Sequence, residues 1–160
     1  MRTQGKLCLG GITLCCAIGK GGRRPKAREG DGITPLGCWP VRGVLYRADR
    51  LRRPRTGLPV RAIRPDDGWC DAPGDGNYNR PVRLPYPRSH ERLWRADHLY
   101  DLVVILGYND RPRSLGRGSA IFMHLARPGY RPTEGCIALS RPDMLKLLSW
   151  LRPGDRVRIP

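Results

Sequence analysis

Cys136 and His124 are the residues whose types and spacing point most directly to chemistry. Cys136 follows the turn sequence of residues 132–135 and opens an apolar segment, which is where a nucleophilic thiol would be held at the edge of a strand. Gly135 lets a substrate carbonyl approach the backbone closely, and the N–H groups of Gly135 and Cys136 could receive a developing oxyanion. The pattern suits a cysteine nucleophile.

His124 is the candidate base for this thiol. It lies twelve residues upstream, at the end of an apolar segment, and two adjacent strands joined by a loop of that length can bring their ends together. The imidazole would stabilise the thiolate near neutral pH and shuttle a proton. Residue type alone favours structural roles, because a buried cysteine usually behaves as a small hydrophobe and a histidine at a strand end is usually structural.

Short apolar segments predict the strands that position these two residues. In the last third of the chain they cover residues 102–106, 119–125, 136–139 and 156–159, and a further short strand is expected at 44–46. Residues 20–40 and 48–96 are rich in Gly, Pro and charge, so we expect mostly loops there. The aromatic residues of the second stretch suggest that it packs on something. The fold class is therefore mainly β.

One helix is predicted over residues 141–151. Ser140 is a suitable N-cap, Pro142 fits the first turn, and Asp143 completes an acidic form of the capping box. The expected apolar side holds Leu145, Leu148, Trp150 and Leu151.

The N-terminal segment allows two interpretations. Basic residues up to position 6 followed by mostly apolar residues 7–19 imitate a signal peptide. However, Gly10-Gly11 divides the apolar run where a two-residue hairpin turn would sit. We therefore favour a hairpin within residues 1–18 over a leader, as part of a single domain of residues 1–160.

The composition limits the function classes. The formal net charge is +16, and Arg supplies 26 of the 30 basic residues, which makes the surface attractive to polyanions. The arginines are dispersed, and no nucleic-acid recognition motif is present, which disfavours a nucleic-acid partner. The six cysteines show no spacing typical of a zinc site, so neither a metal nor another cofactor is expected.

Two pairs of segments resemble the L,D-transpeptidase catalytic domain (YkuD) family. Residues 118–124 and 133–139 are similar to its signature, in which a histidine precedes a Ser/Thr-x-Gly-Cys turn. Residues 17–22 and 26–37 resemble its early strand and its Thr-Pro-x-Gly turn. The resemblance reaches from about residue 15 to the C-terminus.

The resemblance implies a single β domain in which Cys136 attacks the L,D-peptide bond of a peptidoglycan tetrapeptide stem. An amine from a neighbouring stem would then resolve the thioester to form a cross-link. His124 would be the base and then the acid, oriented by the backbone carbonyl of Leu125. Thr133 matches the Ser/Thr position of the family, where it could help hold the turn and is taken as a substrate-binding candidate, and Gly135 matches its oxyanion glycine.

Departures from the family pattern suggest a divergent branch. Glu134 stands where the family commonly has histidine, Ala138 stands where it commonly has arginine, and the His-to-Cys interval is short. Arg127 or Arg131 could replace the missing cation.

Several other residues are weaker candidates. Trp94, Tyr100, Tyr108 and Asn109 could line a substrate groove, and among them Tyr108 is taken as a substrate-binding candidate, although such aromatic residues are more often core. Structural roles are expected for His90 and His98.

Two alternative functions remain open. The same Cys–His site would serve an L,D-carboxypeptidase or peptidase if water replaced the amine, and a basic wall- or nucleic-acid-binding module would need no catalytic pair. The expected substrate places the protein in the periplasm or cell wall, but without a convincing signal peptide a cytoplasmic location stays open. The sequence also leaves the oligomeric state open.

Overall fold

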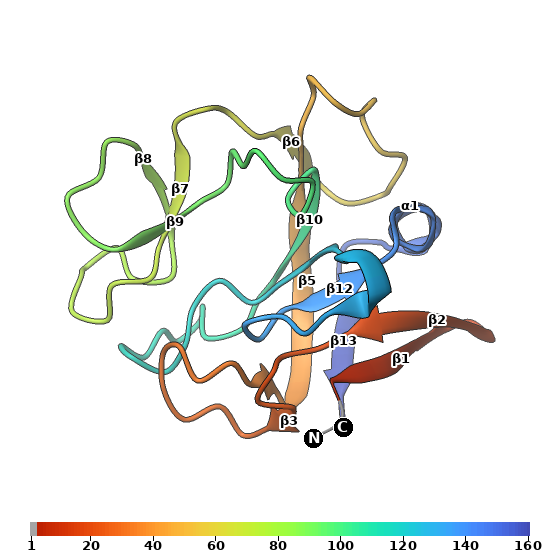
Figure 1. Ribbon diagram of the computed structural model, residues 1–160, viewed down its shortest axis with the longest axis horizontal. Coiled ribbons are helices and arrows are strands. Elements are labelled where there is room, and N and C mark those ends of the chain that lie inside the picture. Colours follow the sequence, from red (N-terminus) through yellow and green to blue (C-terminus); the bar gives the residue numbers. More distant parts are fainter. Residues whose placement is uncertain (1–2) are drawn as a thin grey trace.

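The computed structural model describes residues 3–160, which form mainly strands with one α-helix near the C-terminus (Figure 1). The strands are β1 (Gln4–Leu9), β2 (Ile12–Ala17), β3 (Arg23–Arg24), β4 (Thr34–Pro35), β5 (Gly37–Tyr46), β6 (Val60–Ala62), β7 (Asp67–Cys70), β8 (Pro81–Arg83), β9 (His90–Arg92), β10 (Leu102–Leu106), β11 (Phe122–Leu125), β12 (Ile137–Leu139) and β13 (Arg156–Ile159). The helices are the 3₁₀ turn η1 (Pro128–Tyr130) and α1 (Arg141–Trp150). The mainly β fold agrees with the sequence prediction.

Most strands belong to one main sheet. Its order is β1-β2-β12-β11-β10-β5-β13, and β6 pairs with β5. β11, which contains His124, and β12, which directly follows Cys136, are parallel neighbours near the middle of this sheet. Separately, β8-β7-β9 form a three-stranded antiparallel sheet, and β3 pairs with β4.

The expected N-terminal hairpin is present as β1 and β2. Leu9 pairs with Ile12 across Gly10 and Gly11, whose φ angles of 50° and 82° suit a two-residue turn. β2 also pairs with β12, so the hairpin forms one side of the main sheet rather than lying apart from it. Residues 1–2 of the predicted hairpin lie outside the described residues.

The side-chain alternation of β11 and β12 gives the main sheet two different faces. Met123 and Ile137 pack in the larger core cluster with the buried side of α1. Phe122 and Cys136 point to the opposite face and pack in a second cluster with Trp69 of β7, whose ring meets Phe122 edge-on at 5.1 Å. In Figure 1, α1 and the β7–β9 sheet accordingly lie on opposite sides of the main sheet.

α1 confirms the predicted helix. The Ser140 hydroxyl accepts a hydrogen bond from the Asp143 N–H at 3.2 Å, as expected for the N-cap. The predicted apolar side was partly wrong, because Leu145 and Trp150 are exposed. The buried stripe has helical i, i+3, i+4, i+7 spacing and consists of Met144, Leu147, Leu148 and Leu151. No helix within residues 3–160 is both long and apolar enough to cross a membrane.

Three strand boundaries differ from the sequence prediction. β5 begins at Gly37 instead of residue 44, since Pro40 keeps its place in the sheet by accepting a hydrogen bond from the Gly107 N–H at 2.7 Å. β11 begins at Phe122 instead of residue 119, because Ala120 has a φ of 51°, which no strand residue adopts. β12 begins at Ile137, directly after Cys136.

Residues 48–96 also contain more regular structure than expected. Four short strands, β6 to β9, lie in this stretch. The β7–β9 pairing is missing from the sequence prediction because it joins segments about twenty residues apart that show little periodicity.

Candidate active site

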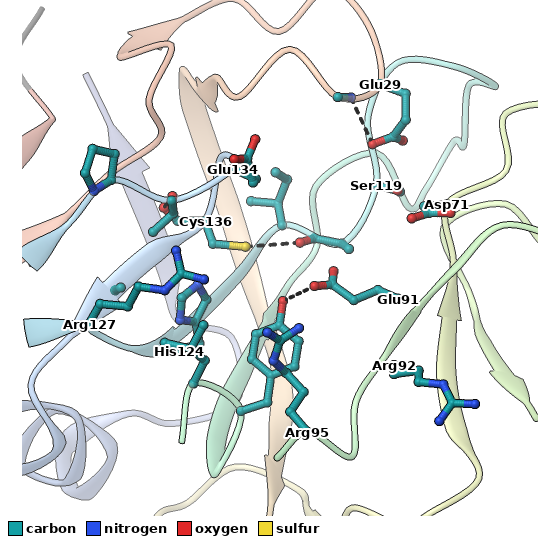
Figure 2. A pocket seen from close by; sticks show the side chains of 18 of the residues that line it. Glu29, Asp71, Glu91, Arg92, Arg95, Ser119, His124, Arg127, Glu134 and Cys136 are labelled. Carbon is teal, nitrogen blue, oxygen red and sulfur yellow. Dashed lines mark hydrogen bonds between the residues drawn. The ribbon is translucent and has the colours of Figure 1, made fainter. Parts of the chain in front are cut away.

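Cys136 lies buried at the start of β12, where its side chain is held by backbone groups. The thiol donates to the carbonyl oxygen of Ala120 at 3.2 Å, and the Phe122 N–H donates to the sulfur at 3.4 Å (Figure 2). Burial raises the pKa of this thiol to about 12, and the nearby Glu91 carboxylate adds to the effect. At rest Cys136 is therefore a neutral thiol.

The ring of His124, in β11, is held by its own neighbour in the chain. Its Nδ1 lies 2.9 Å from the carbonyl oxygen of Leu125. Because a carbonyl only accepts, Nδ1 carries the proton in this contact, and the lone pair is on Nε2. Burial lowers the pKa of His124 to about 4. The resting imidazole is thus neutral and has a free acceptor nitrogen.

The sheet register places the two side chains on one face. In the parallel pair of β11 and β12, His124 lies opposite Ala138 and Met123 lies opposite Ile137, so that Cys136 comes opposite Phe122. Because side chains alternate along a strand, Cys136 and His124 point to the same face of the sheet. Both line one cavity of about 530 Å³, called here the Cys136 cleft. Among residues 3–160 no hydrogen bond joins the sulfur to the ring, since the thiol is directed at Ala120.

The resting protonation differs from the sequence expectation of a thiolate near neutral pH. Burial disfavours the charged form of both groups, raising one pKa and lowering the other. The thiolate is therefore disfavoured in this geometry.

The turn before Cys136 is fixed by Thr133. Its buried hydroxyl donates to the Cys136 carbonyl oxygen at 2.6 Å and accepts from the Gly135 N–H at 3.2 Å. Thr133 was expected among the substrate-binding residues, but its hydroxyl is used inside the turn. Of the two expected oxyanion donors, the Gly135 N–H is also engaged here, which leaves the Cys136 N–H as the candidate.

Only glycine fits at position 135. Its φ is 130°, and a Cβ atom there would lie 2.8 Å from the carbonyl oxygen of Ile33. The Thr34 hydroxyl, which donates to the Gly135 carbonyl oxygen at 2.9 Å, ties the turn to β4. The turn that presents Cys136 is therefore fixed from two sides.

Glu134 points outward. Its carboxylate forms an ion pair with Lys20 at 2.7 Å, and 74% of the side chain is exposed. This carboxylate pairs with neither Arg127 nor Arg131. Solvent screens the charge of this exposed carboxylate, and the ion pair with Lys20 offsets part of that charge.

Arg127 and Arg131 both line the Cys136 cleft and are exposed. Neither forms an ion pair among the described residues. After burial, repulsion from Arg127 further lowers the pKa of His124, which places this cation close to the ring (Figure 2). Ala138, opposite His124, also lines the cleft and leaves room beside the ring.

Tyr108, a substrate-binding candidate from the sequence, is not among the residues that line the Cys136 cleft. Its ring packs edge-on against Trp39 at 4.9 Å, and its hydroxyl donates to the carbonyl oxygen of Arg117 at 2.5 Å. The aromatic side chain serves the core and holds the loop that follows β10.

Of the two remaining histidines, His90 lies at the cleft and His98 is exposed and paired with Asp101.

Several residues of the cleft carry no signal in the sequence. Glu91 lies in β9, Asp71 directly follows β7, and Ser119 comes from the segment before β11. Tyr100 donates to Glu91 at 2.5 Å and its ring contacts that of His124, with centroids 5.3 Å apart. None of these residues lies in a recognisable motif, because only the packing of β7–β9 on the main sheet brings them to Cys136.

The described residues contain no group of three or more His, Cys, Asp or Glu side chains that could hold a metal ion.

Residues 4–159 match the family model of YkuD, the L,D-transpeptidase catalytic domain. No curated protein and no solved structure matches the chain.

Proposed function

The chain belongs to the L,D-transpeptidase catalytic domain (YkuD) family, and we propose that it cross-links peptidoglycan through a thioester on Cys136. The proposed substrate is a tetrapeptide stem, whose terminal D-alanine leaves when the thioester forms. This assigns the protein to the periplasm or cell wall, where such stems lie.

The observation that carries this proposal is the contact between His124 Nδ1 and the Leu125 carbonyl oxygen at 2.9 Å. It fixes the tautomer in which Nε2 can accept a proton, on the sheet face and in the cleft that also hold Cys136. A neutral imidazole next to a neutral thiol can act as a general base at the moment of attack.

The proposed acylation runs in balanced steps. Nε2 of His124 takes the thiol proton as the sulfur attacks the carbonyl carbon of the L,D-peptide bond. The oxyanion forms near the Cys136 N–H, the C–N bond breaks, and the imidazolium returns its proton to the leaving amine of D-alanine. The products are the thioester and neutral His124, which is ready to assist the second half-reaction.

The donor stem ends in a carboxylate, which needs a cation in the cleft. Arg127 and Arg131 are suited to this role because they line the cleft and have no ion pair among the described residues. Arg127 lies on the His124 side of the sulfur in Figure 2. We therefore assign the donor carboxylate to that side.

Mass spectrometry of the protein incubated with a tetrapeptide stem or a carbapenem tests the nucleophile. We expect an adduct on Cys136, and we expect Cys136→Ala to abolish both the adduct and D-alanine release while leaving the fold intact. Cys38→Ala, which removes an exposed thiol far along the chain from the cleft, is the matched control and should keep full activity. An adduct on another cysteine, or turnover by Cys136→Ala, would overturn the mechanism.

A further inference from the structure

One side of the Cys136 cleft is acidic, although the protein as a whole is strongly basic. Glu29, Asp71 and Glu91 all line it, in a chain with a formal net charge of +16. Figure 2 shows Glu91 and Asp71 on one side of the Cys136 sulfur, together with Arg92 and Arg95, and Arg127 with His124 on the other. The carboxylates of Glu91 and Asp71 therefore lie on the side of the sulfur away from His124.

Two polar atoms on the acidic side are buried without a hydrogen-bond partner. They are Oδ1 of Asp71 and Oγ of Ser119, whose residue is only 6% exposed. The Ser119 hydroxyl lies near the Tyr78 phenol but makes no hydrogen bond of normal length. Buried polar atoms without a partner are costly and uncommon, and in a cleft they indicate where a polar ligand would bind.

The carboxylates on this side repel one another. Burial raises the pKa of Glu91, the Tyr100 hydrogen bond and Arg95 lower it, and the charges of Asp71 and Glu29 raise it by smaller amounts. The Arg95 guanidinium is itself held by both oxygens of Asp97 at 2.8 and 2.7 Å. Asp71 has no ion pair among the described residues. A bound cation would relieve the repulsion and supply the missing hydrogen bonds together.

On the strength of the acyl transfer proposed above, we propose that Asp71, Glu91 and Ser119 form an ammonium-binding subsite for the amine that resolves the Cys136 thioester. An alkylammonium group has three N–H donors, which match two carboxylates and a hydroxyl. Trp69 of β7 faces Glu91 of β9, and Asp71, which directly follows β7, continues alongside β9 with its N–H donating to the Ser89 carbonyl oxygen at 3.3 Å.

The second half-reaction at this subsite balances. The bound ammonium gives one proton to the Glu91 carboxylate, and the neutral nitrogen attacks the thioester carbon. A C–N bond forms and the C–S bond breaks, while a second proton moves from nitrogen to His124 Nε2 and then to the departing sulfur. The products are an amide, the Cys136 thiol and protonated Glu91, which returns its proton to water.

The test compares how the acyl-enzyme is divided between an amine acceptor and water. Asp71→Asn and Glu91→Gln keep the side-chain shapes, and the new amide of position 91 can still accept from Tyr100. For an alkylammonium acceptor, such as a stem with a free side-chain amine, we expect the ratio of aminolysis to hydrolysis to fall about tenfold in each variant. Acylation, followed as the first turnover of D-alanine release, should change much less in Asp71→Asn, whereas Glu91→Gln also removes a charge that raises the pKa of the Cys136 thiol.

Hydroxylamine provides the internal control, because it is largely neutral at pH 7 and should not need the carboxylates. Its aminolysis should be nearly unchanged in both variants. Asp110→Asn, which removes a carboxylate paired with Arg42 away from the cleft, is the matched control variant. Equal losses for both acceptors, or no loss with the alkylammonium, would overturn the subsite. A wild-type protein that forms no Cys136 adduct would instead refute the proposed function.

Discussion

Cys136 and His124 are each less than a tenth exposed, and burial acts on their pKa values in opposite directions. The thiol keeps its proton and donates a hydrogen bond to the Ala120 carbonyl oxygen, while the imidazole stays neutral. A thiolate is therefore disfavoured in the resting protein, and in the proposed mechanism it would form only as the substrate is attacked.

This protonation state predicts the acid limb of the pH profile. The base fails only when His124 is protonated, and its pKa is lowered from 6.5 to about 4. We expect kcat/KM to fall with an apparent pKa near 4, with circular dichroism showing that the protein is still folded there. An acid limb near 6.5 would mean that the ring is solvated in the working enzyme and would contradict the buried geometry.

At the scale of elements, the chemistry rests on the turn between η1 and β12. Within this turn, the Thr133 hydroxyl forms hydrogen bonds with the backbone of Cys136 and Gly135. The Thr133 backbone forms hydrogen bonds with Ile18 and Lys20, which lie in the segment after β2. The proposed nucleophile is thus placed by contacts between its own turn and the segment after β2 as well as by the strand that follows it.

Thr133→Val should expose this dependence. Loss of the hydroxyl leaves the buried Cys136 carbonyl and Gly135 N–H without their partner, so we expect a loss of about 1 to 3 kcal/mol in the free energy of unfolding. kcat should fall while KM changes little, since the hydroxyl is used inside the turn. Thr133→Ser keeps the hydroxyl and should retain most activity; a rise in KM alone would instead support direct substrate contact. Denaturant unfolding and steady-state kinetics measure the two effects.

At the scale of the whole molecule, the main sheet separates a structural core from a chemical face. The side with α1 is filled by aliphatic residues, and the side with the β7–β9 sheet holds the cleft. The hairpin of β1 and β2 contributes Leu14 and Cys16 to the first side, and Ile18, which follows β2, packs with them. β2 also pairs with β12. The hairpin therefore supports the strand that follows Cys136.

Removal of residues 1–18 tests this support. Because β12 would become an edge strand and lose buried apolar contacts, we expect the truncated protein to lose cooperative thermal unfolding and Cys136 adduct formation together. Lys6→Ala, which changes an exposed side chain of β1, should leave both unchanged. A truncated protein that stays folded and active would show that the hairpin is dispensable.

The sequence by itself determined the parts that depend on local chemistry. The Ser140 cap, the Gly10-Gly11 turn, the apolar run of β10 and the short closing strand β13 follow from propensities of neighbouring residues, and the structure confirms them. The Gly135-Cys136 turn and the histidine before it were recognisable for the same reason. The spacing of these residues along the chain carries the family resemblance, and the family model that matches residues 4–159 agrees with it.

Only the tertiary structure decided what surrounds that pair. Ala120, with its positive φ, delays the start of β11 to Phe122, and the pairing of β7 with β9 brings Asp71 and Glu91 to the cleft. Tyr108, by contrast, turned out to be core. The protonation of Cys136 and His124 also lies beyond sequence reasoning. A pKa depends on burial and on charges gathered from the whole fold, and these are set by long-range packing rather than by residue type or spacing.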